Sequence, residues 1–161
     1  MGDMRKDYVS DRFMIVSKKD DKIIDPKKSP FAPGNESLTN PSVLSLVAKD
    51  GMLQRLQDSE DDYVKGWSIR VFESKNPIVS IETENSYSDR PHYSEPAYGY
   101  HYIVVASPKE KDTLATIDTE QWSNVLVVVQ DRLRWLYTQK GVSYVSIYAD
   151  QGESAGSHNP H

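Results

Sequence analysis

The stretch "TIDTEQWSNVLVVVQDRLRWLYTQKG", residues 116–141, decides the fold class because it predicts the one long helix of the chain. Its apolar side chains recur at helical spacing: Trp122, Val125, Leu126, Val129, Leu133, Leu136 and Tyr137. Asp118 or Thr119 is suited to cap the first turn, and Gly141 is suited to end the helix. We therefore expect an amphipathic helix with one face packed on a sheet.

The segments on both sides of this helix are typical of strands. "YHYIVVAS" (100–107) and "VSYVSIYA" (142–149) are rich in β-branched and aromatic residues. "GWSIRVFESK" (66–75) alternates apolar and polar side chains, which predicts a half-buried strand. Two further strands are expected near 42–48 and 52–57, because Asp50-Gly51 between them favours a two-residue hairpin turn.

The rest of the chain predicts little regular structure. Residues 82–98 are polar and are expected to form a long loop, and in the first forty residues only "RFMIVS" (12–17) predicts a strand. Prolines between Pro26 and Pro41 exclude a regular element there. We therefore expect an irregular arm over 1–41 and an α+β domain over 42–161, with a mostly antiparallel sheet and one long helix.

The composition limits the classes of function. The net charge is −5, from 19 basic and 24 acidic residues, and this favours neither a nucleic-acid nor an anionic-membrane partner. The absence of cysteine excludes disulfides and thiolate-bound metals. No apolar run is long enough to cross a bilayer, and "MGDMRKDY" is too charged for a signal peptide. We expect a cytoplasmic protein.

The last ten residues, "GESAGSHNPH" (152–161), are compatible with a loop that binds an anion. Gly152 and Gly156 allow the backbone to approach phosphate oxygens, and successive N–H groups can form an anion-binding nest. A flexible tail has a similar composition and is the alternative. His92 and His101 lack the spacing of a metal pair and are interpreted as structural.

Three stretches resemble the galactose-1-phosphate uridylyltransferase family, a branch of the histidine-triad superfamily. They are "SPFAPGNES" (29–37), "AYGYHYIVVASPKEKDTLATI" (97–117) and "VSYVSIYADQGESAGSHNPH" (142–161), and they occur in the family's order. The resemblance covers roughly residues 8–161 and only the N-terminal half of a typical member. It implies a histidine-triad-like half-barrel.

The activity implied by the resemblance is nucleotidyl transfer from a UDP-sugar to a hexose 1-phosphate, through a nucleotidyl-histidine, as in galactose metabolism. The nucleophilic histidine is expected two residues after His161. We therefore expect no catalytic residue in this chain, which would be a fragment that is inactive alone. Its expected partners are a nucleotide sugar and a sugar phosphate, with a homodimer as a possible assembly and no nucleic acid or membrane.

The resemblance also implies a set of nucleotide-binding positions: Phe72, Ser74, Lys75, Asp150, Gly152, Gly156, Ser157 and His158. Two of them depart from the family pattern, because Ser74 and Asp150 each replace an asparagine. A carboxylate at position 150 would repel a diphosphate. Phe72 could pack on a base or belong to the core, and both roles stay open.

The family's structural zinc site is degenerate in this sequence. Ser29 and Ala32 replace two zinc-binding cysteines, and Glu110 replaces a zinc-binding histidine. Of the family's four zinc ligands, only the histidine at position 161 is kept. Tetrahedral zinc sites use four protein ligands, mostly sulfur and nitrogen. We expect no zinc and no other cofactor.

Two alternatives to hexose-1-phosphate nucleotidyl transfer remain. The first is a phosphorylase or hydrolase of the same superfamily that acts on a dinucleotide or a nucleotide sugar. The second is a non-catalytic module for nucleotide binding or dimerisation.

Overall fold

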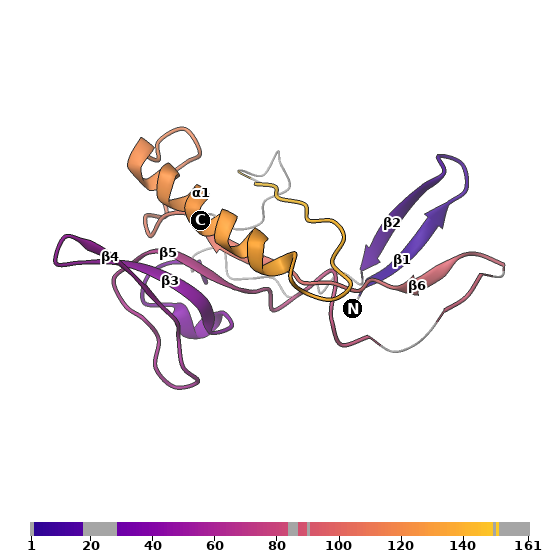
Figure 1. Ribbon diagram of the computed structural model, residues 1–161, viewed down its shortest axis with the longest axis horizontal. Helices are drawn as coiled ribbons and strands as arrows, with labels where there is room; N and C mark the ends of the chain where they lie inside the picture. Colours follow the sequence, from indigo (N-terminus) through magenta and orange to yellow (C-terminus); the bar gives the residue numbers. More distant parts are fainter. Residues whose placement is uncertain (1, 18–28, 84–86, 90, 150, 152–161) are drawn as a thin grey trace. The chain divides into compact units, whose positions relative to one another are not determined.

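The computed structural model describes residues 2–17, 29–83, 87–89, 91–149 and 151 (Figure 1). The chain forms two compact units. One comprises Met1–Asp21 and Ser74–His101, and the other comprises Lys22–Glu73 and Tyr102–His161. This division differs from a boundary at residue 41, which stays a prediction.

The larger unit contains a four-stranded antiparallel sheet with the order β4-β3-β5-β7. Its strands are β3 (Ser42–Lys49), β4 (Met52–Leu56), β5 (Trp67–Glu73) and β7 (Tyr102–Val105). All four were predicted from the sequence, with small differences at their ends. A short 3₁₀ helix, η1 (Glu36–Leu38), precedes β3.

The hairpin between β3 and β4 follows from its turn residues. Asp50 and Gly51 have φ angles of 54° and 77°, and Lys49 pairs with Met52. Two successive positive φ values match the right-handed twist of paired strands, and Asp-Gly accepts them readily. The predicted hairpin is confirmed.

The predicted helix is confirmed as α1 (Thr119–Leu136). Asp118 caps it, because its carboxylate accepts a hydrogen bond of 2.8 Å from the Gln121 N–H. Beyond its C-terminal end, Gly141 has a φ of 85°, a backbone conformation that glycine adopts without strain.

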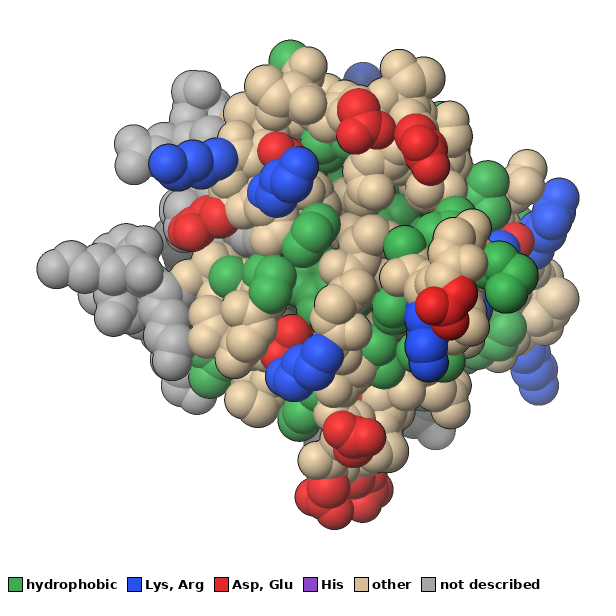
Figure 2. Space-filling view, turned by 90° about the vertical axis from the view of Figure 1, so that its left-hand side faces the viewer, with side chains coloured by type: hydrophobic (Ala, Val, Ile, Leu, Met, Phe, Trp, Pro, Cys, Tyr) green, Lys and Arg blue, Asp and Glu red, His purple; other side chains and the backbone are tan. Residues whose placement is uncertain are grey.

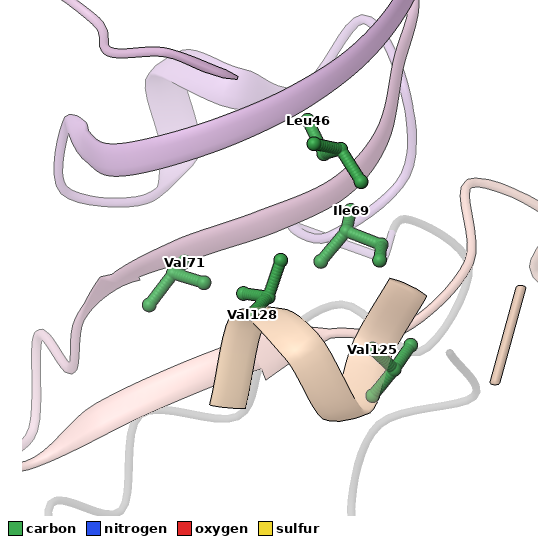
Figure 3. Close-up of a cluster of buried hydrophobic side chains, with 5 residues drawn as sticks. All are labelled: Leu46, Ile69, Val71, Val125 and Val128. Atoms are coloured by element: carbon green, nitrogen blue, oxygen red, sulfur yellow. The ribbon is translucent and has the colours of Figure 1, made fainter. Parts of the chain in front are cut away.

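Helix α1 packs across one face of the four-stranded sheet (Figure 1). Figure 3 shows the contact, in which Val125 and Val128 lie against Leu46 of β3 and against Ile69 and Val71 of β5. These side chains are almost completely buried. The α+β class predicted from the sequence is confirmed by this arrangement.

The strand predicted over 142–149 is wrong. The structure places no strand there, and Tyr144, Ile147 and Tyr148 are exposed. A strand requires a ladder of hydrogen bonds to a neighbour, and none of the described strands pairs with this segment. The residue types were suitable for a strand, but a sequence pattern does not supply the partner.

The smaller unit contains a three-stranded sheet with the order β2-β1-β6. β2 (Arg12–Ser17) was predicted, whereas β1 (Gly2–Asp7) and β6 (Ser94–Pro96) were expected to be irregular. β1 is polar and β6 has three residues, so neither has a periodic apolar pattern. Both form because β1 pairs with β2 on one edge and with β6 on the other.

No helix among the described residues is long and apolar enough to cross a membrane.

The core contact in Figure 3 generates a stability prediction. Ile69 is 0% exposed, so Ile69→Ala leaves a cavity between β5 and α1 and is expected to cost about 2–5 kcal/mol of unfolding free energy. Urea denaturation measures this cost. The matched control is Ile147→Ala, because Ile147 is 60% exposed in the same unit, and its expected cost is below about 0.5 kcal/mol. Equal losses in both variants would contradict the packing described here.

Candidate functional site

The turn that follows β5 carries two of the predicted nucleotide-binding residues, Ser74 and Lys75. The Ser74 N–H donates a 2.8 Å hydrogen bond to the His101 carbonyl, and the Ser74 hydroxyl accepts one of 3.2 Å from the Asn76 N–H. Lys75 is exposed. The turn therefore has an ordered backbone and presents a cation to solvent, and the nucleotide-binding role of both residues stays a prediction.

Phe72 lies in the core of the larger unit. It is 1% exposed and clusters with Trp67 and Val105. The Phe31 ring lies 5.7 Å from its ring centroid, and the Arg70 guanidinium carbon lies 5.2 Å from it. These contacts favour the core role over contact with a base.

The remaining predicted nucleotide-binding residues lie outside the described residues. They are Asp150, Gly152, Gly156, Ser157 and His158, and His161 lies outside as well. Next to them, Gln151 is described, and its side-chain carbonyl accepts a 3.1 Å hydrogen bond from the Leu114 N–H. The roles proposed for the loop stay predictions.

The corner that corresponds to the family's zinc site does not fit a metal. Ser29 is buried, and its hydroxyl accepts a 3.2 Å hydrogen bond from the Phe31 N–H. Its carbonyl accepts a 2.8 Å bond from the Asn35 side-chain amide. Ala32 offers no ligand atom, and Glu110 is exposed. The described residues contain no group of three side chains able to hold a metal ion.

A buried carboxylate next to this corner was missed by sequence reasoning. Glu36 is 1% exposed and accepts hydrogen bonds from Lys65 Nζ at 2.6 Å and from Trp67 Nε1 at 3.0 Å. The Gly34 N–H donates to both of its oxygens, at 3.0 and 3.1 Å. We call these four residues the Glu36 cluster. Lys65 and Trp67 lie 29 and 31 residues after Glu36 in the sequence, so no local motif could have identified the cluster.

The Glu36 cluster has an electrostatic signature. Burial opposes ionisation, but the bonds from Lys65, Gly34 and Trp67 outweigh it and hold the pKa of Glu36 at about 2. The carboxylate is therefore charged at neutral pH and fixes the 29–36 corner against the start of β5.

A buried ion pair lies on the same face of the sheet. Arg70 Nη2 lies 2.5 Å from Asp58 Oδ2, and the two side chains are 1% and 0% exposed. Asp58 also accepts hydrogen bonds from the Ser42 N–H at 2.7 Å and the Val64 N–H at 2.8 Å. Arg70 Nη1 donates to the Thr39 hydroxyl at 2.9 Å. This network joins three segments on the sheet face opposite α1.

On the α1 face, Tyr102 lies at the start of β7 and its hydroxyl donates a 3.1 Å hydrogen bond to Glu73. The guanidinium of Arg132 lies 4.9 Å from the Tyr102 ring centroid and 4.6 Å from that of Trp135. Burial and the Glu73 carboxylate raise the pKa of Tyr102 to about 12, although Arg132 acts in the opposite direction. Tyr102 is thus a neutral donor at physiological pH.

The surface charge is mixed. Figure 2 shows one face of the molecule, on which basic and acidic side chains are interspersed rather than gathered by sign.

Comparison with known proteins places the chain in a family. The sequence model described as "Galactose-1-phosphate uridyl transferase, N-terminal domain" matches residues 56–161. The chain therefore belongs to the galactose-1-phosphate uridylyltransferase family, as the resemblance in the sequence indicated.

One curated relative is the ADP-glucose phosphorylase of Arabidopsis thaliana, which is 24% identical over 99% of this chain and 46% of the relative. This chain thus spans about half the length of that protein. A crystal structure of an ADP-glucose phosphorylase from Arabidopsis thaliana with bound ADP-glucose matches this chain with a TM-score of 0.61. The match covers 100% of this chain and 46% of the chain in that structure.

Two further solved structures share the fold. A GalT-like protein from Arabidopsis thaliana is 24% identical and matches with a TM-score of 0.62. The match covers 98% of this chain and 44% of that protein's chain. A uridylyltransferase is 17% identical and also matches with a TM-score of 0.62. The match covers 88% of this chain and 37% of the uridylyltransferase chain. These likenesses show that the fold is that of this family.

The Glu36 cluster generates a pH prediction. Because the pKa of Glu36 falls from 4.5 to about 2 on folding, its stabilisation is complete above about pH 4.5 and is lost as the pH falls toward 2. The shift corresponds to on the order of 3 kcal/mol. In urea titrations between pH 7 and pH 2, Glu36→Gln is expected to lower the unfolding free energy at pH 7. It is also expected to reduce the acid limb, which is the fall of the unfolding free energy as the pH drops from about 4.5 toward 2. Glu60→Gln, at an exposed position, is the control and should follow the wild type. An unchanged acid limb in Glu36→Gln would contradict the assignment.

The corner around Ser29 and Ala32 generates a prediction about metal. Because it offers too few ligand atoms, the purified protein is expected to contain no stoichiometric zinc, and a chelator should leave its melting temperature unchanged. Elemental analysis and thermal denaturation with and without the chelator measure both. About one tightly bound zinc per chain would show this conclusion to be wrong.

Proposed function

We propose that this chain binds a nucleotide sugar and serves nucleotidyl transfer of the ADP-glucose phosphorylase type. The observation that carries the proposal is the match to an ADP-glucose phosphorylase across 99% of the chain. The same relative was crystallised with ADP-glucose bound. This is the phosphorylase alternative of the sequence analysis, and it takes precedence over transfer to a hexose 1-phosphate.

The chemistry of the proposal follows from the nucleotidyl-histidine that the family resemblance implies. A neutral imidazole nitrogen attacks the α-phosphorus of the nucleotide sugar, and the bond to the β-phosphate oxygen breaks, which releases the sugar 1-phosphate. Inorganic phosphate then attacks the same phosphorus, which yields the nucleoside diphosphate and frees the histidine. The family pattern places that nucleophile two positions after His161, so the residues proposed here act in binding.

Lys75 is the binding residue that the structure supports most directly. Its ammonium group is exposed, and no hydrogen bond or ion pair joins it to another described residue. A cation without a protein partner can pair with a phosphate oxygen without first breaking another interaction. Ser74, Asp150, Gly152, Gly156, Ser157 and His158 are the other proposed contacts.

A second candidate is exchange between a UDP-sugar and a hexose 1-phosphate. The description of the family model favours it, because that description names galactose 1-phosphate and a uridyl group. A non-catalytic nucleotide-binding or dimerisation module is the remaining alternative. A cytoplasmic location and a homodimer belong to the proposal as well.

Calorimetric titration of the 161-residue chain with ADP-glucose and with UDP-glucose tests the proposal. ADP-glucose is expected to bind with a dissociation constant weaker than about 0.1 mM, or roughly −5.5 kcal/mol, because Asp150 opposes the diphosphate. Lys75→Ala should weaken binding about threefold to tenfold through loss of a charge-assisted contact.

The matched control is Lys111→Ala, at another exposed lysine, which should bind as the wild type does. Tighter binding of UDP-glucose than of ADP-glucose would favour the second candidate. An absence of heat with both ligands at millimolar concentration would remove all nucleotide-binding functions.

A further inference from the structure

A single residue, His101, closes both ends of the turn formed by residues 74–78. At the start of the turn, the Ser74 N–H donates a 2.8 Å hydrogen bond to the His101 backbone carbonyl. At its end, the Ile78 N–H donates a 3.3 Å hydrogen bond to Nδ1 of the His101 ring. The five-residue turn that carries Ser74 and Lys75 is therefore fixed from one position.

The second of these bonds determines the tautomer of His101. A neutral imidazole has one protonated and one unprotonated nitrogen, and only the unprotonated one accepts a hydrogen bond. Because Nδ1 accepts from Ile78, the proton of the neutral ring is on Nε2. Burial lowers the pKa of His101, and the neutral form is thereby favoured at physiological pH.

Ile78 is also fixed on its carbonyl side. A Cβ placed on Gly2 would lie 2.3 Å from the Ile78 carbonyl oxygen, so β1 approaches this residue closely at a position where only glycine fits. Within the turn, the Ser74 hydroxyl accepts a 3.2 Å hydrogen bond from the Asn76 N–H. The backbone around Lys75 is thus restrained on both sides, whereas the Lys75 side chain is exposed.

We propose that His101 is a positioning residue for nucleotide-sugar binding, because its ring and its carbonyl together hold Ser74 and Lys75 in one arrangement before the ligand arrives. This inference rests on the proposed function. A turn that is already ordered loses less conformational entropy when it binds a ligand, and the affinity rises accordingly. His101 acts through the turn and needs no contact with the ligand of its own.

Two substitutions separate this role from simple packing. His101→Asn keeps an acceptor, since the asparagine Oδ1 is as many bonds from Cα as the histidine Nδ1. His101→Leu keeps a similar volume without an acceptor. Neither change removes the backbone bond to Ser74. His92→Asn is the control, because His92 is an exposed histidine in the same unit. Its ring centroid lies 6.0 Å from that of Tyr8.

The experiment uses the 161-residue chain, with ADP-glucose as the ligand in calorimetry. The ¹⁵N shifts of the imidazole report the tautomer, and amide hydrogen exchange reports the protection of the Ile78 N–H. We expect the Nε2–H tautomer, and a protected Ile78 amide in the wild type and in His101→Asn but not in His101→Leu. Affinity for ADP-glucose should fall about threefold to tenfold in His101→Leu and stay within about twofold of the wild type in His101→Asn and His92→Asn.

Three outcomes would overturn the proposal: an Nδ1–H tautomer in the wild type, an unprotected Ile78 amide in the wild type, or equal ADP-glucose affinity in His101→Leu and the wild type. Exchange at Met4 and Ile15, which pair between β1 and β2 in the same unit as His101, shows whether that unit is folded in each variant. If the wild-type chain binds no ADP-glucose, the proposed function fails and the ligand role of His101 fails with it. The tautomer and the Ile78 amide then still decide whether His101 orders the turn.

Discussion

The buried ion pair between Arg70 and Asp58 is the constraint on which one whole face of the four-stranded sheet depends. Arg70 projects from the middle of β5 into a region without solvent, where an unpaired charge would cost several kcal/mol. Asp58 can neutralise it only if the chain after β4 returns across this face. Asp58 also accepts hydrogen bonds from the Ser42 and Val64 N–H groups, and Arg70 donates one to the Thr39 hydroxyl, so the irregular segments around the strands are positioned by this pair of charges.

The other buried carboxylate, Glu36, plays a comparable part at the neighbouring corner. In this chain, where Ser29 and Ala32 replace the thiolates of the family's zinc motif, the hydrogen bonds that Glu36 accepts from Gly34, Lys65 and Trp67 fix the loop to the sheet. A metal site fixes several segments through one ion, whereas here one side chain accepts all the bonds. Both buried acids lie on the sheet face opposite α1, and the α1 face is apolar.

The parts of the structure that could be predicted are those with a local signal. The helix follows from the spacing of Val125 and Val129 and from the Asp118 cap, and the β3–β4 hairpin follows from Asp50-Gly51. The pairing of β1 with β6 and the contacts of Glu36 and Arg70 join residues that are distant in the sequence, and no periodicity reveals them. Phe72 shows where sequence-based prediction ends at the candidate site. An aromatic residue at the end of an alternating strand suits a ligand contact and a core position equally well, and only its burial in the structure favours the core position.

The sheet of the smaller unit has a consequence for the order of folding. β1 is complete after the first residues of the chain, but its second neighbour, β6, begins only at Ser94. Closing such a long loop costs conformational entropy before the pairing returns any stabilisation, which makes high-contact-order pairing slow. During synthesis, the β1–β2 hairpin therefore stays without its third strand until most of the other sheet has left the ribosome. An isolated two-stranded hairpin is only marginally stable. A nascent chain stalled before Ser94 would expose one edge of β1, and that edge is a natural target for chaperones.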